Sequence, residues 1–207
     1  MNKGILISIE GIDGCGKTTL AKNLKQYFEE KKLNILLTQE PGGTKLGQKL
    51  RQILHEEKNM TSDLPEYLLF AADRAQHFEQ IIIPNLKQNK IIISDRMADS
   101  SLAYQGYGRG LNIEMIKKVN NWAMQNVEPN IVIYVKIDTQ TAFDRINKRN
   151  EKLTSFEQEK KDFWQKVLNG YKEIFKNKKN IITVDGTLSP EELTKQTIEL
   201  LTTKLNF

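Results

Sequence analysis

Short apolar runs rich in isoleucine and valine recur along the chain, with longer amphipathic segments between them. The runs cover residues 5–9, 35–37, 91–93, 131–135 and 181–184. Runs of this kind are typical of strands that are buried on both faces of a sheet. The segments between them repeat apolar residues with helical spacing. Strand and helix therefore alternate, which predicts an α/β fold with a central parallel sheet of about five strands and helices on both faces.

Local signals place some boundaries within this pattern. Asp63 is predicted to cap a helix that carries Pro65 and Glu66 in its first turn, with Glu66 reaching back as in a capping box. We expect this helix to run to Pro84. The polar and charged stretch 149–156 is predicted to form a mobile surface loop. Because no repeat or flexible linker interrupts the pattern, residues 1–207 are predicted to form a single domain.

Composition narrows the class of protein. The chain has 207 residues, of which 39% are hydrophobic, and no apolar run approaches the roughly 18 residues that a membrane helix needs. A single cysteine fits a reducing compartment, so we expect a cytoplasmic protein. The net charge is +5, but residues 145–179 alone hold eleven basic and five acidic residues. The positive excess is local and its aromatic residues have helical spacing, so neither nucleic-acid binding nor a membrane partner is expected.

The strongest motif follows the first apolar run. It matches G-x-x-x-x-G-K-[ST] and comprises Gly11, Ile12, Asp13, Gly14, Cys15, Gly16, Lys17 and Thr18. Between a predicted strand and a predicted helix, such a loop turns backbone N–H groups toward phosphate oxygens. Lys17 is predicted to bridge the β- and γ-phosphates of ATP, with Thr19 next to the same site. Thr18, with Asp95 from a neighbouring strand end, is predicted to bind Mg²⁺.

A phosphate loop alone does not separate a kinase from a GTPase or a motor ATPase. A GTPase would carry D-x-x-G after the third strand and N-K-x-D later in the chain. Here Arg96 follows Asp95 instead. A fixed guanidinium at this point suits a second anionic substrate better than a water nucleophile.

Several further segments form a recognisable set. They are Glu10 leading into the phosphate loop, Glu-Pro-Gly-Gly-Thr at 40–44, Leu-Phe-Ala-Ala-Asp-Arg at 69–74, Asp-Arg at 95–96, and the stretch 100–106. Together these segments resemble the thymidylate kinase family. The resemblance implies a three-layer P-loop kinase fold with a short lid near residues 148–157. It also implies transfer of the ATP γ-phosphate to dTMP with Mg²⁺, and a homodimer.

The resemblance also implies roles for residues of the dTMP site. Phe70 would stack on thymine, and Arg74, one helical turn later, would donate to the thymine O4 atom. Cytosine presents a donor at that position, and the mismatch would cost about 1 to 3 kcal/mol. Taken alone, Phe70 would more often be a core residue and Arg74 a solvated charge. The remaining residues assigned to dTMP are Asp13 at the 3′-hydroxyl, Ser101 and Gln105 at the base, Tyr104 at the sugar, Arg96 and Arg51 at the phosphate, and Glu40 with Pro41.

The match departs from the family at the cation that completes the transfer site. The family supplies an arginine from the phosphate loop or from the lid, whereas the loop here offers Gly14 and Cys15, and Ser155 stands at the expected lid position. Arg149 is the predicted substitute, and the predicted catalytic residues are therefore Lys17, Arg96 and Arg149. His55 and His77 are left as surface or structural residues, since no metal-ligand spacing accompanies them.

Three alternatives stay open on the sequence alone. One is a phosphate-loop kinase for deoxynucleosides or for another monophosphate. Another is a nucleotide-dependent switch or a nucleic-acid-associated ATPase. The third is an inactive relative that binds dTMP without turnover, which the departure at Ser155 allows.

Overall fold

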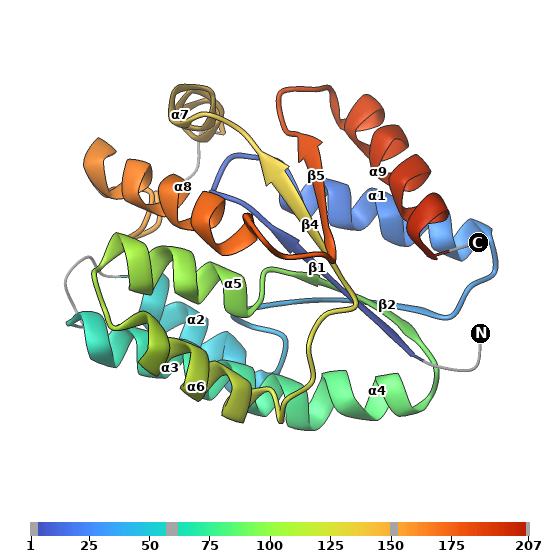
Figure 1. The fold of residues 1–207 in the computed structure, drawn as a ribbon, viewed down its shortest axis with the longest axis horizontal. Coiled ribbons are helices and arrows are strands. Elements are labelled where there is room, and N and C mark those ends of the chain that lie inside the picture. The colour runs from blue at the N-terminus through green and yellow to red at the C-terminus, as the bar shows by residue number, and fades with distance from the viewer. Residues whose placement is uncertain (1–3, 57–61, 150–152, 206–207) are drawn as a thin grey trace.

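Five parallel strands form the centre of the molecule (Figure 1). The computed structural model describes residues 4–56, 62–149 and 153–205. Within these ranges the sheet has the order β2-β3-β1-β4-β5. Its strands are β1 (Ile5–Glu10), β2 (Ile35–Gln39), β3 (Ile91–Asp95), β4 (Ile131–Lys136) and β5 (Ile181–Asp185). Each strand coincides with a predicted apolar run, so the predicted α/β fold with a parallel sheet is confirmed.

Helices cover both faces of this sheet. In Figure 1, α1 (Lys17–Glu30) and α9 (Pro190–Leu205) lie together on one side. The other side carries α2 (Lys45–Glu56), α3 (Asp63–His77), π-helix η1 (Phe78–Ile82), α4 (Ile83–Lys87), α5 (Ala98–Ser101), π-helix η2 (Leu102–Gly108) and α6 (Ile113–Ala123). The last two helices are α7 (Thr139–Lys148), beside the end of β4, and α8 (Lys161–Phe175), which packs against η2. No helix in the described ranges is long and apolar enough to span a bilayer.

Alternate residues of the central strands pack into different clusters. Ile7 and Ile9 of β1 join a core with Leu20 and Leu24 of α1. Leu6, whose side chain lies on the opposite face of the pleat, packs instead with Phe78 and Ile82 of η1. Burial on both faces explains why the strands read as continuous apolar runs and not as alternating patterns.

The predicted start of α3 is wrong in detail. Ser62 occupies the N-cap position, and Asp63 is the first residue of the helix. The Glu66 side chain does not reach back, because it accepts hydrogen bonds from Gln105 and Arg109. Tertiary partners thus outcompete the local capping box.

The predicted end of this helix is also too early. The α-helical hydrogen bonding stops at His77, and helical structure then continues through η1 and α4 to Lys87. Pro84 lies at the start of α4, directly after the π-helix η1, where the helical hydrogen-bonding pattern changes. The proline is therefore accommodated inside a longer helical segment.

The strand order brings the chemically active loops together. β3 pairs with both β1 and β2, so the carboxyl ends of these three strands are neighbours. The phosphate loop follows β1, the Glu-Pro-Gly-Gly turn follows β2, and Arg96 follows β3. Ligands of open parallel sheets bind at this edge.

Candidate active site

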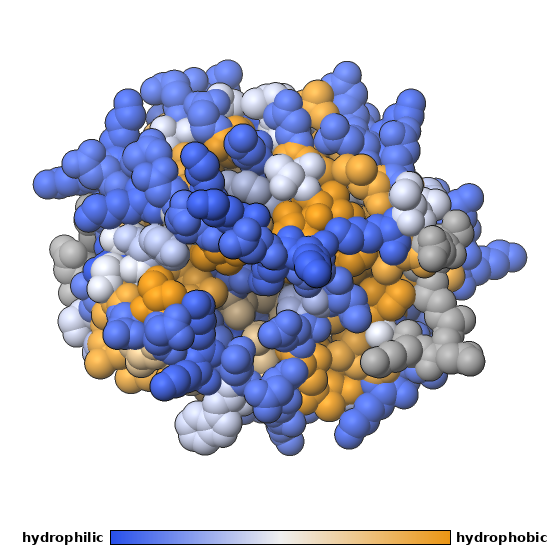
Figure 2. Space-filling model, viewed as in Figure 1, coloured by the Kyte–Doolittle hydropathy of each residue, from blue (hydrophilic) through white to orange (hydrophobic). Residues whose placement is uncertain are grey.

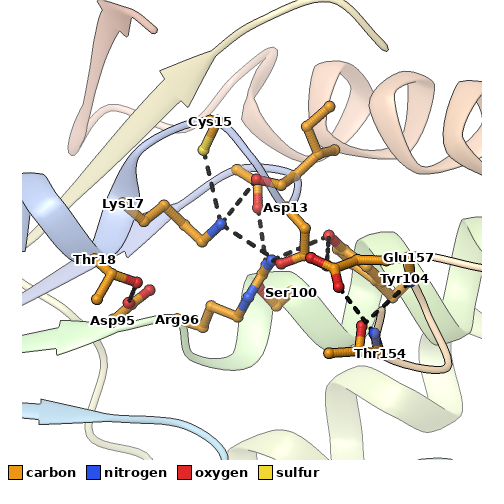
Figure 3. A network of polar contacts seen from close by, with 12 residues as sticks. Asp13, Cys15, Lys17, Thr18, Asp95, Arg96, Ser100, Tyr104, Thr154 and Glu157 are labelled. Atoms are coloured by element: carbon orange, nitrogen blue, oxygen red, sulfur yellow. Dashed lines mark hydrogen bonds and ion pairs between the residues drawn. The ribbon is translucent and has the colours of Figure 1, made fainter. Parts of the chain in front are cut away.

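The phosphate loop has the backbone that its sequence predicts. Gly14 has a φ of 79°, in the left-handed region, and a Cβ added there would lie 2.6 Å from the Ala142 carbonyl oxygen. Only glycine fits both conditions. The loop leads into α1, whose first residue, Lys17, donates from Nζ to the Ile12 carbonyl at 2.8 Å. Figure 3 shows the Lys17 amine directed across the loop toward Asp13.

A cavity, here called the loop cavity, opens above this turn. It is lined by Asp13, Gly14, Gly16, Lys17, Thr18, Thr19, Gln39, Glu40, Arg51, His55, Asp95, Arg96, Arg145, Arg149, Thr154 and Glu157. Six of the nine residues predicted to bind ATP are among them. The other three, Gly11, Ile12 and Cys15, are buried beneath the loop and shape it from below.

Two oxygen-bearing side chains of the loop cavity lie close enough to share a cation. Thr18 Oγ1 donates to Asp95 Oδ2 at 2.6 Å (Figure 3). Among the described residues no group of three or more His, Cys, Asp or Glu side chains could hold a metal ion. A pair of oxygen ligands that leaves room for phosphate oxygens and water fits Mg²⁺, which keeps much of its hydration shell.

A second cavity, the aromatic cavity, lies next to the first. It brings together all ten residues that the sequence assigned to dTMP: Asp13, Glu40, Pro41, Arg51, Phe70, Arg74, Arg96, Ser101, Tyr104 and Gln105. Four more residues line it that the sequence analysis did not assign, namely His55, Met97, Ser100 and Phe156. Ser100 lies inside a motif that carried the resemblance, so only the other three lacked a sequence signal.

Arg74 is held in place on three sides. Its Nε atom donates to Glu40 Oε2 at 2.9 Å, one Nη to Asn120 Oδ1 at 2.7 Å and the other to Ser101 Oγ at 3.1 Å. The side chain is 2% exposed, which excludes the solvated charge considered above. Asn120 also accepts from the Tyr67 hydroxyl at 3.1 Å. Asn120 belongs to α6, and nothing in its local sequence signals this contact.

Glu40 anchors the same network from the β2 end. Its second oxygen lies 2.9 Å from His77 Nδ1, and His77 Nε2 lies 2.7 Å from Thr38 Oγ1. Burial alone would raise the pKa of Glu40, but Arg74 and His77 outweigh it and the pKa is lowered. His77 is fully buried, so the prediction of a structural histidine is confirmed there.

Arg96 bridges the two cavities. It adopts a φ of 69° directly after β3. Its guanidinium pairs with the Asp13 carboxylate (Figure 3) and lies over the Tyr104 ring in a cation–π contact, 5.0 Å from the ring centre. Burial would raise the pKa of Asp13, yet Arg96 and Lys17 lower it to about 2. Asp13 is therefore an anion at neutral pH and fixes the guanidinium beside the phosphate loop.

Glu10 supports this arrangement from beneath. Its carboxyl accepts from the Met97 backbone N–H at 2.8 Å, from Ser100 Oγ at 2.6 Å and from the Tyr171 hydroxyl at 3.3 Å. Burial raises the pKa of Glu10 to about 8, with a further contribution from Asp99. The group ties β1 to the turn that carries Arg96.

The segment before α8 differs from the surface loop that its composition predicts. Phe156 is 5% exposed, and its ring centre lies 5.9 Å from those of both Phe70 and Tyr104. Ser155 is also buried and donates from Oγ to the Leu54 carbonyl at 2.8 Å. Polar composition concealed these contacts, because they are made with distant residues of α2, α3 and η2. Residues 150–152 of the predicted loop lie outside the described residues.

Arg149 lies at the mouth of the loop cavity and is already paired. Its guanidinium contacts Glu157, whose other oxygen accepts from the Thr154 backbone N–H at 2.9 Å. The Arg149 side chain is 43% exposed, so it can exchange this carboxylate for another anion.

Five side chains line both cavities: Asp13, Glu40, Arg51, His55 and Arg96. We call this set the junction. Three of its members carry nitrogen donors. Anionic groups bound in the two cavities would therefore face each other across a strip of N–H donors.

Comparison with known proteins agrees with this arrangement. A family model described as thymidylate kinase matches residues 9–198. Over 200 residues the chain is 42% identical to a thymidylate kinase of Thermoanaerobacter sp. (strain X514), covering 96% of this chain and 98% of that protein. It is 42% identical over 190 residues to one from Acholeplasma laidlawii, covering 89% and 92%. A solved thymidylate kinase from Ehrlichia chaffeensis is similar in structure with a TM-score of 0.80 at 31% identity, covering 96% and 98%.

Proposed function

The chain belongs to the thymidylate kinase family, and we propose that it transfers the γ-phosphate of ATP to dTMP, giving dTDP and ADP, in dTTP biosynthesis. The observation that carries the proposal is the junction, where an acceptor cavity and a phosphate-loop cavity share Arg51, His55 and Arg96. Two phosphates that meet there can react in line without passing through solvent.

The aromatic cavity is proposed to hold dTMP. Phe70 would stack on thymine, with Phe156 closing the far edge of the pocket. Arg74, Ser101 and Gln105 would read the base edge. Because Arg74 already donates to Glu40 and Asn120, its remaining donor capacity is fixed in direction, which favours the O4 acceptor of thymine over the amino group of cytosine.

The junction is proposed to hold the acceptor phosphate. Arg96 would contact it, and Arg51, whose guanidinium donates to the Pro41 carbonyl at 2.8 Å, would approach from α2. Asp13 would accept a hydrogen bond from the 3′-hydroxyl of dTMP, and Tyr104 would pack against the sugar. Glu40 and Pro41 would form the floor of the site. No catalytic base is required, since phosphate oxygens are already nucleophilic.

The loop cavity is proposed to hold ATP. Backbone N–H groups from Gly11 to Thr19 would surround its phosphates, and Lys17 would bridge the β- and γ-phosphates. Thr18 and Asp95 would hold Mg²⁺, and their 2.6 Å contact supports this because both atoms are hard oxygen ligands. Bound with ATP, the ion supplies neutralising charge at the β- and γ-oxygens.

Arg149 is proposed as the mobile cation that completes the transfer site. Its place on the rim of the loop cavity supports this role, as does its exposed pairing with Glu157. Entry of the triphosphate would draw the guanidinium away from the carboxylate. We propose that residues 1–207 act as one domain with this lid near residues 148–157.

A homodimer is proposed from an apolar face on α2 and α3. The face consists of Leu46, Ile53, Leu64 and Leu68, which are 37% to 48% exposed. Figure 2 shows apolar side chains at the surface over the lower left of the molecule, where α3 and α6 lie in Figure 1. Large exposed apolar side chains on two adjacent helices are typical of a protein interface, and we propose a second copy as the partner. We also propose a cytoplasmic location without nucleic-acid or membrane partners.

A coupled assay of ADP release tests the reaction. ATP and Mg²⁺ are supplied with dTMP, dUMP, dCMP, dGMP, UMP or thymidine at matched concentration. Fast release with dTMP, ahead of dUMP and well ahead of dCMP, is the expected result. Chelation of the metal should abolish it.

The other outcomes discriminate the alternatives. Release with thymidine would indicate a nucleoside kinase, and release without an acceptor but stimulated by polynucleotide would indicate an ATPase. Tight dTMP binding without any turnover would indicate an inactive relative and would contradict the proposal.

A further inference from the structure

His55 has an unusual position in this site. It lies in the last turn of α2, four residues after Arg51, so both side chains leave the same face of the helix. Its ring lies edge-on to Phe156, with the centres 6.2 Å apart. It lines both the loop cavity and the aromatic cavity. His55 therefore lines the candidate site, a place that its local sequence did not predict.

Its neighbours in the junction are committed to protein partners, whereas His55 is not. Asp13 pairs with Arg96, and Arg51 donates to the Pro41 carbonyl. Among the residues that the structure describes, neither ring nitrogen of His55 has a hydrogen-bond partner. The imidazole is therefore available to a ligand that fills the junction.

Charges of both signs surround His55. Arg51 faces it from α2 and Arg96 from the end of β3, while Asp13 faces it from the phosphate loop and Glu157 from the segment before α8. Burial, followed by Arg51, lowers the pKa of His55 to about 4, despite the opposing effect of both carboxylates. The imidazole is neutral at pH 7 before nucleotides bind.

Nucleotide phosphates would reverse this balance. An opposite charge within about 4 to 6 Å favours the charged form of a group by about 1 to 3 pKa units. Two sets of phosphate oxygens would meet at the junction, and the carboxyl end of α2 also favours a cation in its last turn. Both effects favour the imidazolium.

Protonation of His55 would supply a positive charge that the expected lid position lacks. Ser155 stands there, and its hydroxyl is bound to the carbonyl of Leu54, the residue before His55. That position therefore directs no cation at the phosphates, whereas His55, the residue after Leu54 in α2, carries an imidazole that becomes a cation when it is protonated.

We propose that His55 is a catalytic residue that donates an N–H to phosphate oxygens at the junction and takes up a proton from solvent when ATP and dTMP bind. This inference rests on the proposed function and names a contact that the family resemblance did not supply. A positive charge that arrives with the substrates stabilises the transferring group without repelling Arg51 and Arg96 in the empty site.

Nuclear magnetic resonance tests the proton uptake on the unmodified protein. The chain has two histidines, so selective labelling of the imidazole ring gives two signals, and His55→Gln identifies one of them. We expect the titration midpoint of His55 to rise by about 3 pH units, from about 4 to near neutrality, when dTMP, Mg²⁺ and a non-hydrolysable ATP analogue are added. An unchanged midpoint would overturn the proposal.

Kinetics tests the contact. His55→Leu should lower kcat by about tenfold or more, since a hydrogen bond to a charged group is lost. His55→Gln keeps an N–H donor but cannot gain charge, so it should lower kcat less than His55→Leu does. In the pH profile of His55→Gln, the decrease in kcat at higher pH that comes from deprotonation of His55 should be absent. Gln52→Ala, an exposed change on the same helix, is the control and should match the wild type.

The outcomes separate the two proposals. If both His55 variants stay within about threefold of the wild type with its pH profile, the role of His55 is refuted and the kinase activity stands. If the wild type does not phosphorylate dTMP, the proposed function fails, and the shift of the His55 midpoint on nucleotide binding still decides whether His55 meets the phosphates.

Discussion

At the scale of single residues, the site depends on charged groups that hold one another in place before substrate arrives. Asp13 fixes Arg96, Glu40 fixes Arg74, and Glu157 holds Arg149. The first two pairs are largely buried, whereas Arg149 is exposed on one side. Separating a buried ion pair leaves an uncompensated charge and is costly, whereas an exposed ion pair is weak and can change partners. Arg149 is therefore the guanidinium best suited to move during the reaction.

Replacement of Arg149 tests its role as the mobile cation. Arg149→Ala should lower kcat by about a thousandfold, the effect of removing an arginine that stabilises the transferring phosphoryl group. The KM for dTMP should change little, because Arg149 does not line the aromatic cavity. Steady-state kinetics with dTMP as acceptor measures both values.

A neighbouring lysine provides the control for this measurement. Lys148→Ala removes a neighbouring positive charge that does not line the loop cavity, and it should stay close to the wild type. A loss of less than about tenfold in Arg149→Ala would contradict the assignment, since an arginine finger contributes far more.

At the scale of elements, base reading depends on contacts between helices that are distant in sequence. α3 carries Phe70 and Arg74, but α6 supplies Asn120, which accepts from Arg74 at 2.7 Å and from Tyr67 at 3.1 Å. Asn120 Nδ2 also donates to the Ala98 carbonyl at 3.3 Å. The orientation of the guanidinium therefore depends on how α3, α5 and α6 pack.

Asn120→Leu should weaken base recognition more than catalysis. It leaves an Arg74 donor without its acceptor, whereas the Tyr67 hydroxyl keeps the Ile116 carbonyl at 3.0 Å. The KM for dTMP should rise about tenfold or more while kcat falls less. Discrimination between dTMP and dCMP should narrow. Asn120→Asp, which keeps the acceptor, should recover part of the loss.

The control for this prediction lies one residue away. Asn121→Leu changes an exposed asparagine on the same helix and should leave KM unaltered. Equal KM values for Asn120→Leu and the wild type would show that Arg74 does not need this acceptor.

Glu10 connects β1, the turn after β3 and α8, and it predicts a pH dependence of stability. Burial, with Asp99, raises its pKa from 4.5 to about 8 in the folded protein. A group whose pKa is raised by folding stabilises the folded state below its unfolded pKa and loses that contribution as the pH rises through its folded pKa. The free energy of unfolding should therefore fall between roughly pH 5 and pH 8.

Urea denaturation of the wild type and Glu10→Gln at about pH 6 and about pH 9 measures this term, because glutamine does not ionise. The wild type should lose more stability than the variant over this interval. Parallel losses in both proteins would mean that Glu10 does not take up a proton on folding.

At the scale of the whole molecule, the apolar face on α2 and α3 stands beside the substrate site. Both helices also supply site residues, Arg51 and His55 from α2 and Phe70 and Arg74 from α3. A partner packed on their outer surface would hold the inner surface in position. Assembly and substrate binding are therefore expected to be linked.

Leu68→Asp should disrupt the proposed homodimer, because it puts a charge at the centre of the apolar face. Light scattering coupled to gel filtration should show a dimer for the wild type and a monomer for the variant. Leu200→Asp, at a leucine of α9 that is 40% exposed, should remain dimeric. A monomeric wild type would contradict the proposed interface.

The sequence by itself determined the strands, the phosphate loop and ten of the fourteen residues that line the aromatic cavity. Strand formation follows from local apolar runs, and the loop follows from glycines whose backbone requirement is local. Residues such as Phe70, Arg74 and Tyr104 were identifiable because they lie in contiguous motifs that carry the family resemblance.

Only the tertiary structure decided the partners of these residues. Asn120 reaches Arg74 across 46 positions, Ser155 reaches Leu54 across 101, and Glu66 leaves its predicted cap for Gln105. His55 gained its place because α2 lies between the two cavities. Each contact depends on how helices pack over the sheet, and a buried polar group takes whichever partner that packing brings within reach.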